Sequence, residues 1–339
     1  MIGILLTVLF FGVAIMVHEA GHFLVAKASG IRVNEFAIGM GPAIFHFQKG
    51  ETKYALRLFP IGGYVSMEGE LEDSSDLHSY NNTSVYKRMA VILAGAFMNF
   101  VLGVLLLGVL LMVGGNVITT TIAEVSDTVP ATAAVLQPGD RITEINGHTL
   151  LCAQDLQFEL SQISIEEPLT VTVKRGDDQF TFEDVGSVWT DESGIQHRGL
   201  GVTLATESIG ITNLVPQIAG NALFDVKLVW ESLTDLVTGQ VSWTQVSGPV
   251  GVTQAVEQAQ SFGWLSVISL FAFLSINIGI FNLIPFPALD GGQFVFLLIE
   301  AVRRKPIKRE IQSTVNLIGF GLLMLLIIIV TVKDVIFLF

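Results

Sequence analysis

The chain has 339 residues, of which 51% are hydrophobic and only 14% are charged, and its mean hydropathy is +0.62. Soluble globular domains carry about 25% charged residues, so this composition excludes a soluble domain and indicates an integral membrane protein. The formal net charge of −13 excludes nucleic acid as a partner, because phosphates need clustered lysine and arginine on a binding face. A single cysteine, Cys152, excludes an internal disulfide framework.

Four hydrophobic segments meet the length of a transmembrane helix, which needs about 20 residues to cross a hydrocarbon core of about 30 Å. They span approximately residues 2–25, 89–113, 262–284 and 315–338. The sequence therefore predicts a polytopic α-helical membrane protein with four transmembrane helices. Two of them lie in a first membrane part, residues 1–113, and two in a second, residues 262–339.

The distribution of basic residues predicts how these helices are oriented, because lysine and arginine accumulate in cytoplasmic loops. Basic residues lie between the first two helices and just before the fourth: Lys27, Arg32, Lys49, Lys53, Arg57, Lys87, Arg88, Arg303, Arg304, Lys305, Lys308 and Arg309. Residues 114–261, by contrast, hold five basic and nineteen acidic residues. We expect a protein of the inner (plasma) membrane whose 114–261 segment and both termini are extracytoplasmic.

The first part of this outer segment, residues 116–205, alternates short β-rich runs with glycine-containing turns, which predicts a small β-rich domain. Its stretch from Ala131 to Leu150, ATAAVLQPGDRITEINGHTL, strongly resembles a bacterial PDZ domain. The resemblance implies a partner that is an extended peptide or a chain terminus, bound as an added strand. Gly199-Leu-Gly-Val202 is similar to the carboxylate-binding loop of that family, although an ordinary turn explains it equally well.

Two further segments flank these elements. Residues 206–261 contain an amphipathic, helical pattern that suits either the outer membrane interface or packing on the β-rich domain. Residues 36–68 are rich in glycine and aromatic residues, alternate too much for a helix and are too apolar for a solvated loop. They predict a membrane-associated β segment beside the first helix, because non-helical backbone is tolerated in a membrane only against protein or a wet cavity.

The chemistry begins with His18-Glu-Ala-Gly-His22 in the first helix. Residues i and i+4 lie on one face of a helix, so both imidazoles can bind one metal ion while Glu19 points to the adjoining space. Imidazole suits Zn²⁺, and a carboxylate beside the metal can take a proton from bound water. Charged residues inside a membrane helix normally face a functional interior. The alternative is a polar cluster that stabilises helix contacts.

A catalytic zinc generally has three protein ligands, so a third must come from elsewhere in the chain. Apart from Glu300 and Asp334, Asp290 is the acidic residue in or beside the third and fourth hydrophobic regions. It follows Pro285 and Pro287, which break a helix, and precedes Gly291 and Gly292, which permit close packing. The alternative role for Asp290 is the N-cap of a helix that starts at residue 291.

With these motifs the sequence resembles the site-2 proteases, the intramembrane zinc metalloproteases, and in particular their bacterial PDZ-bearing group. The resemblance covers nearly the whole chain. It rests on the first-helix motif, the PDZ stretch, Ala94-Gly-Ala-Phe-Met-Asn-Phe100, Ser247-Gly-Pro-Val-Gly251 and Asn277-Ile-Gly-Ile-Phe-Asn-Leu-Ile-Pro-Phe-Pro-Ala-Leu-Asp-Gly-Gly292.

The resemblance implies that His18, His22 and Asp290 bind zinc, that Glu19 is the general base, and that Asn277 and Asn282 hold an unwound substrate strand. Interhelical hydrogen bonding is the alternative role of the two asparagines. The implied substrates are single-pass membrane proteins in the lipid bilayer, such as an anti-sigma factor or a remnant signal peptide. Two other function classes stay open at this stage, a membrane transporter and a non-catalytic PDZ scaffold.

Overall fold

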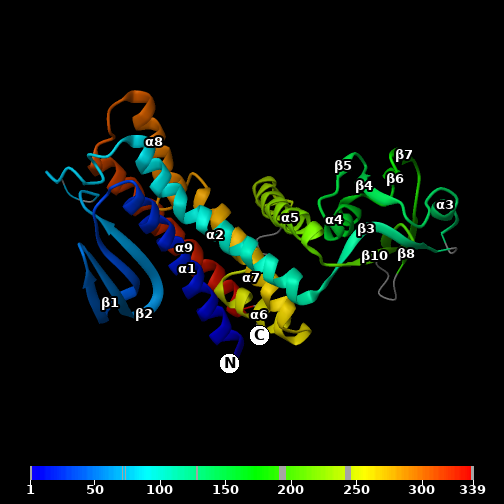
Figure 1. The fold of residues 1–339 in the computed structure, drawn as a ribbon, viewed down its shortest axis with the longest axis horizontal. Helices are drawn as coiled ribbons and strands as arrows, with labels where there is room; N and C mark the ends of the chain where they lie inside the picture. The colour runs from blue at the N-terminus through cyan, green and yellow to red at the C-terminus, as the bar shows by residue number, and fades with distance from the viewer. Residues whose placement is uncertain are drawn as a thin grey trace. The chain divides into compact units, whose positions relative to one another are not determined.

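The computed structural model describes residues 2–70, 72, 74–126, 129–190, 196–240 and 246–336. The chain forms two compact units, a membrane unit of Met1–Leu106 with Asp225–Phe339 and a β-rich unit of Leu107–Phe224. Figure 1 shows the elements of both.

Four helices in the described residues are long and apolar enough to cross a membrane: α1 (Ile2–Ala28), α2 (Val85–Gly114), α7 (Trp264–Leu283) and α9 (Arg309–Ile336). The expectation of four long apolar helices is therefore confirmed. Helices α2 and α9 begin several residues earlier than the apolar stretches predict, because each extends through a polar first turn. The last two residues of the predicted 315–338 span lie outside the described residues.

Strands β1 (Val33–Lys49) and β2 (Thr52–Met67) form an antiparallel sheet that packs against α1 (Figure 1). Residues 35–38 of β1 pair on one side with residues 53–56 and on the other with residues 63–66. Both strands therefore fold back on themselves, at Gly39 (φ 83°) and Gly62 (φ 81°), where a residue with a Cβ would be strained. The second half of β2 becomes an edge of the sheet.

The membrane helices are tied together by shorter elements. Helix α6 (Pro249–Phe262) contacts both α1 and α9. At its start, the backbone N–H groups of Gly248 and Gly251 each donate a hydrogen bond of 2.9 Å to Asp334 Oδ2 in α9. Helix α8 (Asp290–Arg303) is joined to α2 by a two-pronged ion pair between Glu300 and Arg88. These contacts position α8, which carries Asp290.

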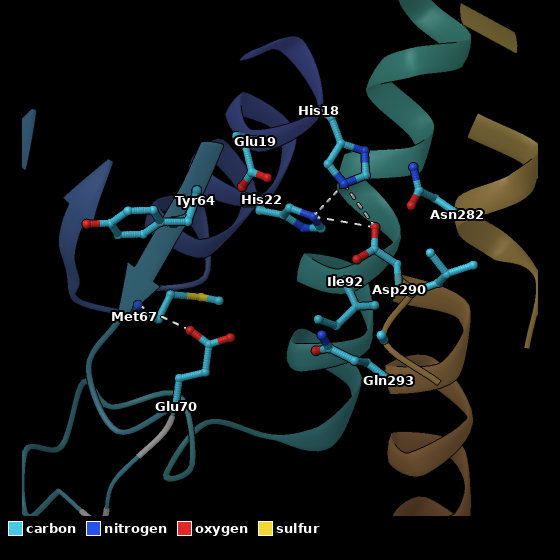
Figure 2. Close-up of a pocket in the computed structure, with 13 residues that line it drawn as sticks. His18, Glu19, His22, Tyr64, Met67, Glu70, Ile92, Asn282, Asp290 and Gln293 are labelled. Carbon is cyan, nitrogen blue, oxygen red and sulfur yellow. Dashed lines mark hydrogen bonds and ion pairs between the residues drawn. The ribbon is translucent and has the colours of Figure 1, made fainter. Parts of the chain in front are cut away.

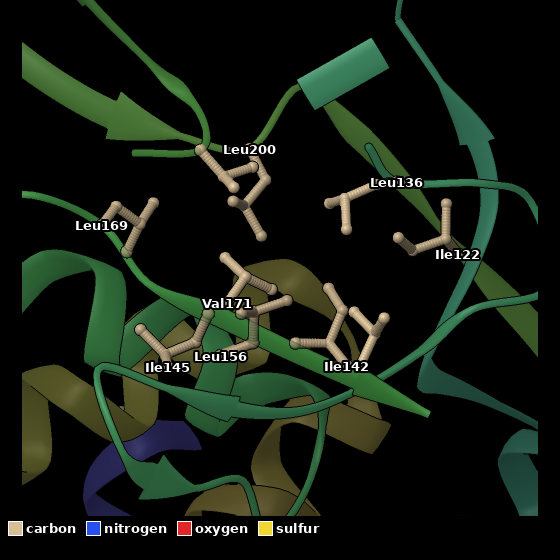
Figure 3. Packing of buried hydrophobic residues seen from close by; sticks show 10 residues of the cluster. Ile122, Leu136, Ile142, Ile145, Leu156, Leu169, Val171 and Leu200 are labelled. Carbon is tan, nitrogen blue, oxygen red and sulfur yellow. The ribbon is translucent and has the colours of Figure 1, made fainter. Parts of the chain in front are cut away.

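The second unit holds a six-stranded antiparallel sheet, as far as the structure describes it. Its strands are β3 (Asn116–Val125), β4 (Arg141–Ile145), β5 (His148–Thr149), β6 (Val171–Arg175), β7 (Asp178–Phe182) and β10 (Val202–Ser208). It also contains α3 (Pro130–Ala133), α4 (Ala153–Gln162) and the hairpin of β8 (Ser187–Thr190) with β9 (Gln196–Gly199). Figure 3 shows its core, in which branched aliphatic side chains from the sheet pack against Leu156 of α4. Residues 116–205 thus belong to a β-rich region, and α5 (Ile211–Thr238) follows it.

The ion pair between Asp140 and Arg175 should stabilise the β-rich unit. Asp140 is 1% exposed and accepts hydrogen bonds from the Gln137 N–H (2.9 Å) and from Arg175 Nε and Nη2 (2.7 and 2.8 Å). Arg175 holds the pKa of the Asp140 carboxyl below its usual range. The ionised Asp140 carboxylate therefore stabilises the folded state at pH values above about 3.9, the pKa of an aspartate in the unfolded chain. This stabilisation is lost as the pH falls through the lower pKa that Asp140 has in the folded state.

We expect Asp140→Asn to destabilise this unit by about 1.5–3 kcal/mol, the contribution of a hydrogen bond to a charged group. Cys152 is buried in the same unit and is the sole thiol, so its rate of maleimide labelling reports local unfolding. Labelling at pH 7 should be faster in the variant. The ratio of the variant's labelling rate to that of the wild type should fall towards one as the pH is lowered, because the wild type then loses the contribution of the Asp140 carboxylate. Taking the ratio at each pH cancels the slower reaction of the protonated thiol with maleimide. Equal labelling rates at pH 7 would contradict a stabilising role.

Candidate active site

Side chains from α1 and α8 converge at one point in the membrane unit (Figure 2). His18 Nε2 lies 3.1 Å from His22 Nε2 and 3.2 Å from Asp290 Oδ2, and His22 Nε2 lies 3.5 Å from the same carboxylate oxygen. The side chains of His18 and Asp290 are only 12% and 13% exposed. Among the described residues, these three form the group whose ligand atoms could hold a metal ion.

The donor set and its dimensions fit zinc. A tetrahedral zinc with bonds of about 2.0–2.1 Å holds its ligand atoms about 3.3–3.4 Å apart, close to the three separations found here. Asp290 Oδ2 is buried and has no hydrogen-bond partner among the described residues. Two imidazole nitrogens and a carboxylate oxygen that face one another at 3.1–3.5 Å form an arrangement that a cation would stabilise.

The orientation of His22 is set by α2. Its Nδ1 lies 2.8 Å from the backbone carbonyl oxygen of Val91, and a carbonyl oxygen can only accept a hydrogen bond. Nδ1 therefore carries the proton, and the Nε2 lone pair is directed towards His18 and Asp290. This pairing of a ligand imidazole with a backbone carbonyl is typical of metal sites.

Asp290 is presented by a strained turn. Helix α8 starts at Asp290 itself, and Leu289 occupies the N-cap position without a side-chain cap. The alternative role of Asp290 as the N-cap is therefore wrong. Two residues earlier, Ala288 has a φ of 75°, which a residue with a Cβ rarely adopts. Its N–H donates a 3.2 Å hydrogen bond to Asn316 Oδ1 of α9, which helps to hold the turn.

The three converging side chains open onto a cavity of about 280 Å³. Glu19 lines it, and Figure 2 shows its carboxylate beside His22. Asn282 of α7 also lines it and donates a hydrogen bond of 3.0 Å to the backbone oxygen of Ile278. Asn277 is not among the described residues that line the cavity. The position of the cavity therefore distinguishes Asn282 from Asn277, although both lie in the same sequence motif.

One acidic residue of the cavity has no counterpart in the sequence motifs. Glu70 lies in the connection between β2 and α2, and its carboxylate accepts a 3.3 Å hydrogen bond from the Met67 N–H. Burial raises the pKa of Glu70 to about 7, so part of this carboxyl is neutral at neutral pH. Nothing in the local sequence of Glu70 distinguishes it from a surface residue.

Two residues of α2 that touch the histidines were also missed, although both lie in the motif from Ala94 to Phe100. Asn99 is fully buried, and its amide nitrogen Nδ2 lies 3.2 Å from His18 Nδ1. Gly95 packs directly on the imidazoles: a Cβ here would lie 2.6 Å from His22 Cε1 and 2.7 Å from His18 Cε1. Both contacts depend on the packing of α2 on α1, and a single sequence does not show which face of α2 packs on α1.

Gly95→Ala should therefore displace the histidine rings and weaken metal binding. Because a change to a group that packs on the ligands and orients them typically costs 10–100-fold in metal affinity, we expect at least a tenfold loss of zinc affinity in a chelator competition. Gly12→Ala is the matched control, since a Cβ at Gly12 of α1 meets nothing within 4 Å. Wild-type zinc affinity in Gly95→Ala would show that the rings tolerate the added methyl group.

Comparison with known proteins identifies the family. The model of peptidase family M50 matches residues 6–326. A Clostridium perfringens protein described as a candidate zinc metalloprotease is 38% identical, with 98% of each chain covered. Zinc metalloprotease RasP of Shouchella clausii is 32% identical over 96% of each chain. Regulator of sigma-W protease RasP of Bacillus subtilis is 30% identical over 97% of each chain.

A solved PDZ domain of an SdrC-like protein from Listeria monocytogenes is 28% identical, covers 27% of this chain and 88% of that chain, and has a TM-score of 0.21. The family model spans most of the chain, from α1 into α9, including every cavity residue described above. The protein therefore belongs to peptidase family M50, the site-2 proteases, and is an intramembrane zinc metalloprotease.

Proposed function

We propose that His18, His22 and Asp290 hold the catalytic zinc ion and that Glu19 is the general base. The observation that carries this proposal is the convergence of two imidazole nitrogens and one carboxylate oxygen, all within 4.8 Å of one another, beside a cavity that Glu19 lines. When bound, zinc polarises the scissile carbonyl and lowers the pKa of a bound water. Three protein ligands leave one position open for this chemistry.

Glu19 moves the proton in this scheme. Its carboxylate takes a proton from the attacking water as the water oxygen bonds to the scissile carbon, and it then delivers that proton to the leaving amine as the C–N bond breaks. A side chain adjacent in sequence to His18 and facing the same cavity is placed for both transfers. The other residues that line the cavity surround the space that the peptide would occupy.

The edge of the β1–β2 sheet offers a place for that peptide. Residues 63–66 pair with β1 on one side, and the described residues supply no backbone partner on the other. A Cβ on Gly63 would lie 3.0 Å from Glu19 Cγ, and Tyr64 and Val65 line the cavity. We expect an unwound substrate segment to add to this edge as a strand. Asn282, which lines the cavity, would hold the same segment, together with Asn277 five residues before it in α7.

The substrates we propose are single-pass membrane proteins, such as an anti-sigma factor or a remnant signal peptide. Support comes from the Bacillus subtilis relative, whose name describes it as a regulator of sigma-W. Further support is that His18 and His22 lie in α1, one of the four helices that are long and apolar enough to cross a membrane. A spanning segment is helical, so it must unwind before its carbonyls become accessible.

We assign residues 116–205 as an extracytoplasmic PDZ domain that binds a peptide or a chain terminus. We assign residues 206–261, after the end of β10 at Ser208, as an extracytoplasmic amphipathic helical linker. The PDZ-like motif from 131 to 150 and the six-stranded sheet support the first assignment. The excess of nineteen acidic over five basic residues in 114–261 supports its placement outside.

This orientation predicts which side of the membrane a thiol probe reaches. In a Cys152→Ala background, we expect Glu207→Cys, at an exposed position of β10, to react with membrane-impermeant maleimide in intact spheroplasts. Lys305→Cys, in the basic connection between α8 and α9, is the matched cytoplasmic control and should react only after the membrane is opened. The reverse pattern would invert the topology.

A cleavage assay tests the function itself. Purified protein in liposomes would be given a panel of single-pass proteins, including anti-sigma factors and signal peptide remnants, each tagged at both ends. We expect zinc-dependent cleavage within or near the membrane segment of at least one of them. Cleavage confined to soluble, exposed segments would contradict a membrane-segment substrate.

A further inference from the structure

The side chain of Asn99 contacts a proposed zinc ligand but belongs to none of the roles described so far. Asn99 lies in α2, is fully buried, and places its amide nitrogen Nδ2 3.2 Å from His18 Nδ1, the ring nitrogen that does not face Asp290. The Asn99 Oδ1 atom is buried and has no hydrogen-bond partner among the described residues. A polar side chain without exposure to water, in contact with a histidine, requires an explanation.

The tautomer of His18 determines whether His18 Nδ1 donates a hydrogen bond to Asn99 or accepts one from it. His18 Nε2 faces His22 Nε2 at 3.1 Å and Asp290 Oδ2 at 3.2 Å, so Nε2 is the atom available to a metal ion. A neutral imidazole that binds through Nε2 carries its proton on Nδ1. The Nδ1–H group of His18 then needs an acceptor, as the Nδ1–H of His22 has the carbonyl of Val91.

Asn99 can supply that acceptor in one of its two amide orientations. The oxygen and nitrogen of an amide have nearly the same shape, and the hydrogen-bond network determines which faces a partner. As placed, the amide nitrogen Nδ2 faces His18, so Nδ1 would have to accept the hydrogen bond and the proton would sit on Nε2, where the metal binds. Exchanging the amide oxygen and nitrogen removes this conflict. Only the orientation with Oδ1 towards His18 is compatible with a ligand at Nε2.

The backbone of Asn99 is itself fixed. Ser275 Oγ of α7 donates a 2.9 Å hydrogen bond to the Asn99 carbonyl oxygen, and both residues are fully buried. One turn earlier, Gly95 lets α2 approach the two imidazoles. Helices α2 and α7 therefore hold the amide at a defined distance from the first helix, as a positioning residue requires.

We infer that Asn99 is a positioning residue that accepts a hydrogen bond from His18 Nδ1–H through Oδ1 and thereby keeps Nε2 free to bind zinc. This inference rests on the zinc site proposed above. It assigns a role in metal affinity, not in proton transfer, since Asn99 touches no reacting atom.

Zinc affinity of purified, folded variants tests the inference, measured by competition with a chelator. Asn99→Leu keeps the side-chain size but removes the acceptor, and we expect it to bind zinc 10–100-fold more weakly than the wild type. Asn99→Asp keeps an oxygen acceptor and should bind at least as tightly as the wild type. Asn221→Leu, the same change in α5, is the matched control and should leave zinc affinity unchanged.

The outcomes separate this inference from the site on which it rests. A wild-type protein that binds no zinc would contradict the zinc site. If the wild-type protein binds zinc and Asn99→Leu binds it with the same affinity, only the role of Asn99 is overturned. A tenfold or greater loss in Asn99→Asp would also overturn it, because an acceptor facing Nδ1 would then be unfavourable. If neither variant folds, ¹⁵N NMR of zinc-loaded wild type decides: an unprotonated His18 Nδ1 overturns the inference.

Discussion

Glu19→Gln is expected to abolish cleavage while leaving the zinc and the fold in place. A carboxamide has the size of a carboxylate but cannot accept the proton of the attacking water, and general-base catalysis contributes about 10²–10⁴-fold. Glu19 is not one of the three converging ligands, so zinc content should stay at the wild-type level. The measurement is the rate of cleavage of a single-pass substrate in liposomes, beside zinc content by elemental analysis.

A matched control for this variant is Glu70→Gln, which makes the same chemical change at another carboxyl that lines the cavity. Because burial raises the pKa of Glu70 to about 7, that side chain is already partly neutral, and its loss of charge should matter far less than the loss at Glu19. Turnover by Glu19→Gln within a few fold of the wild type would remove Glu19 from the mechanism. Loss of zinc in Glu19→Gln would indicate that Glu19 is a zinc ligand and not the general base.

Asp290→Ala should lower zinc content as well as activity. Removing one of three protein ligands leaves the histidine pair to hold the ion alone, and a catalytic zinc generally has three. His22→Ala should behave in the same way, since its Nε2 lies at the same point of convergence. The two variants should therefore lose zinc stoichiometry, measured by elemental analysis of the purified proteins.

Asn282→Ala separates ligation from a general disturbance of the cavity. Asn282 lines the same cavity on α7, but its side chain donates to its own helix at Ile278 and is not part of the ligand group. Zinc content should stay at the wild-type level while substrate affinity falls. Full zinc occupancy in well-folded Asp290→Ala would reject ligation by Asp290.

The parts of the site that the sequence predicts are those encoded by local spacing. His18 and His22 are four residues apart on one helix, so their convergence follows from helix geometry. Hydropathy predicts the four apolar helices, because each contains an apolar stretch long enough to cross a bilayer. Elimination among the acidic residues of the second membrane part predicts Asp290 as the third ligand, and Asp290 Oδ2 lies 3.2 Å from His18 Nε2 in the structure.

The rest depends on packing between distant segments. The contacts of Asn99 and Gly95 with the histidines exist only because α2 lies against α1, and no periodicity in the sequence encodes which face of α2 does so. The left-handed conformation of Ala288 opposes the local preference of alanine and persists because Asn316, 28 residues later, accepts its N–H. Asn277 and Asn282 share one motif, and only the position of the cavity distinguishes them.

Zinc K-edge X-ray absorption on the purified wild-type protein tests the central claim most directly. We predict one zinc per chain, with a first shell of two imidazole nitrogens and oxygen ligands at about 2.0–2.2 Å and no sulfur. The imidazole scattering should fall in His22→Ala. A sulfur ligand in the wild type, or an unchanged first shell in a His18→Ala/His22→Ala double variant, would contradict the assignment of His18, His22 and Asp290 as the site of zinc.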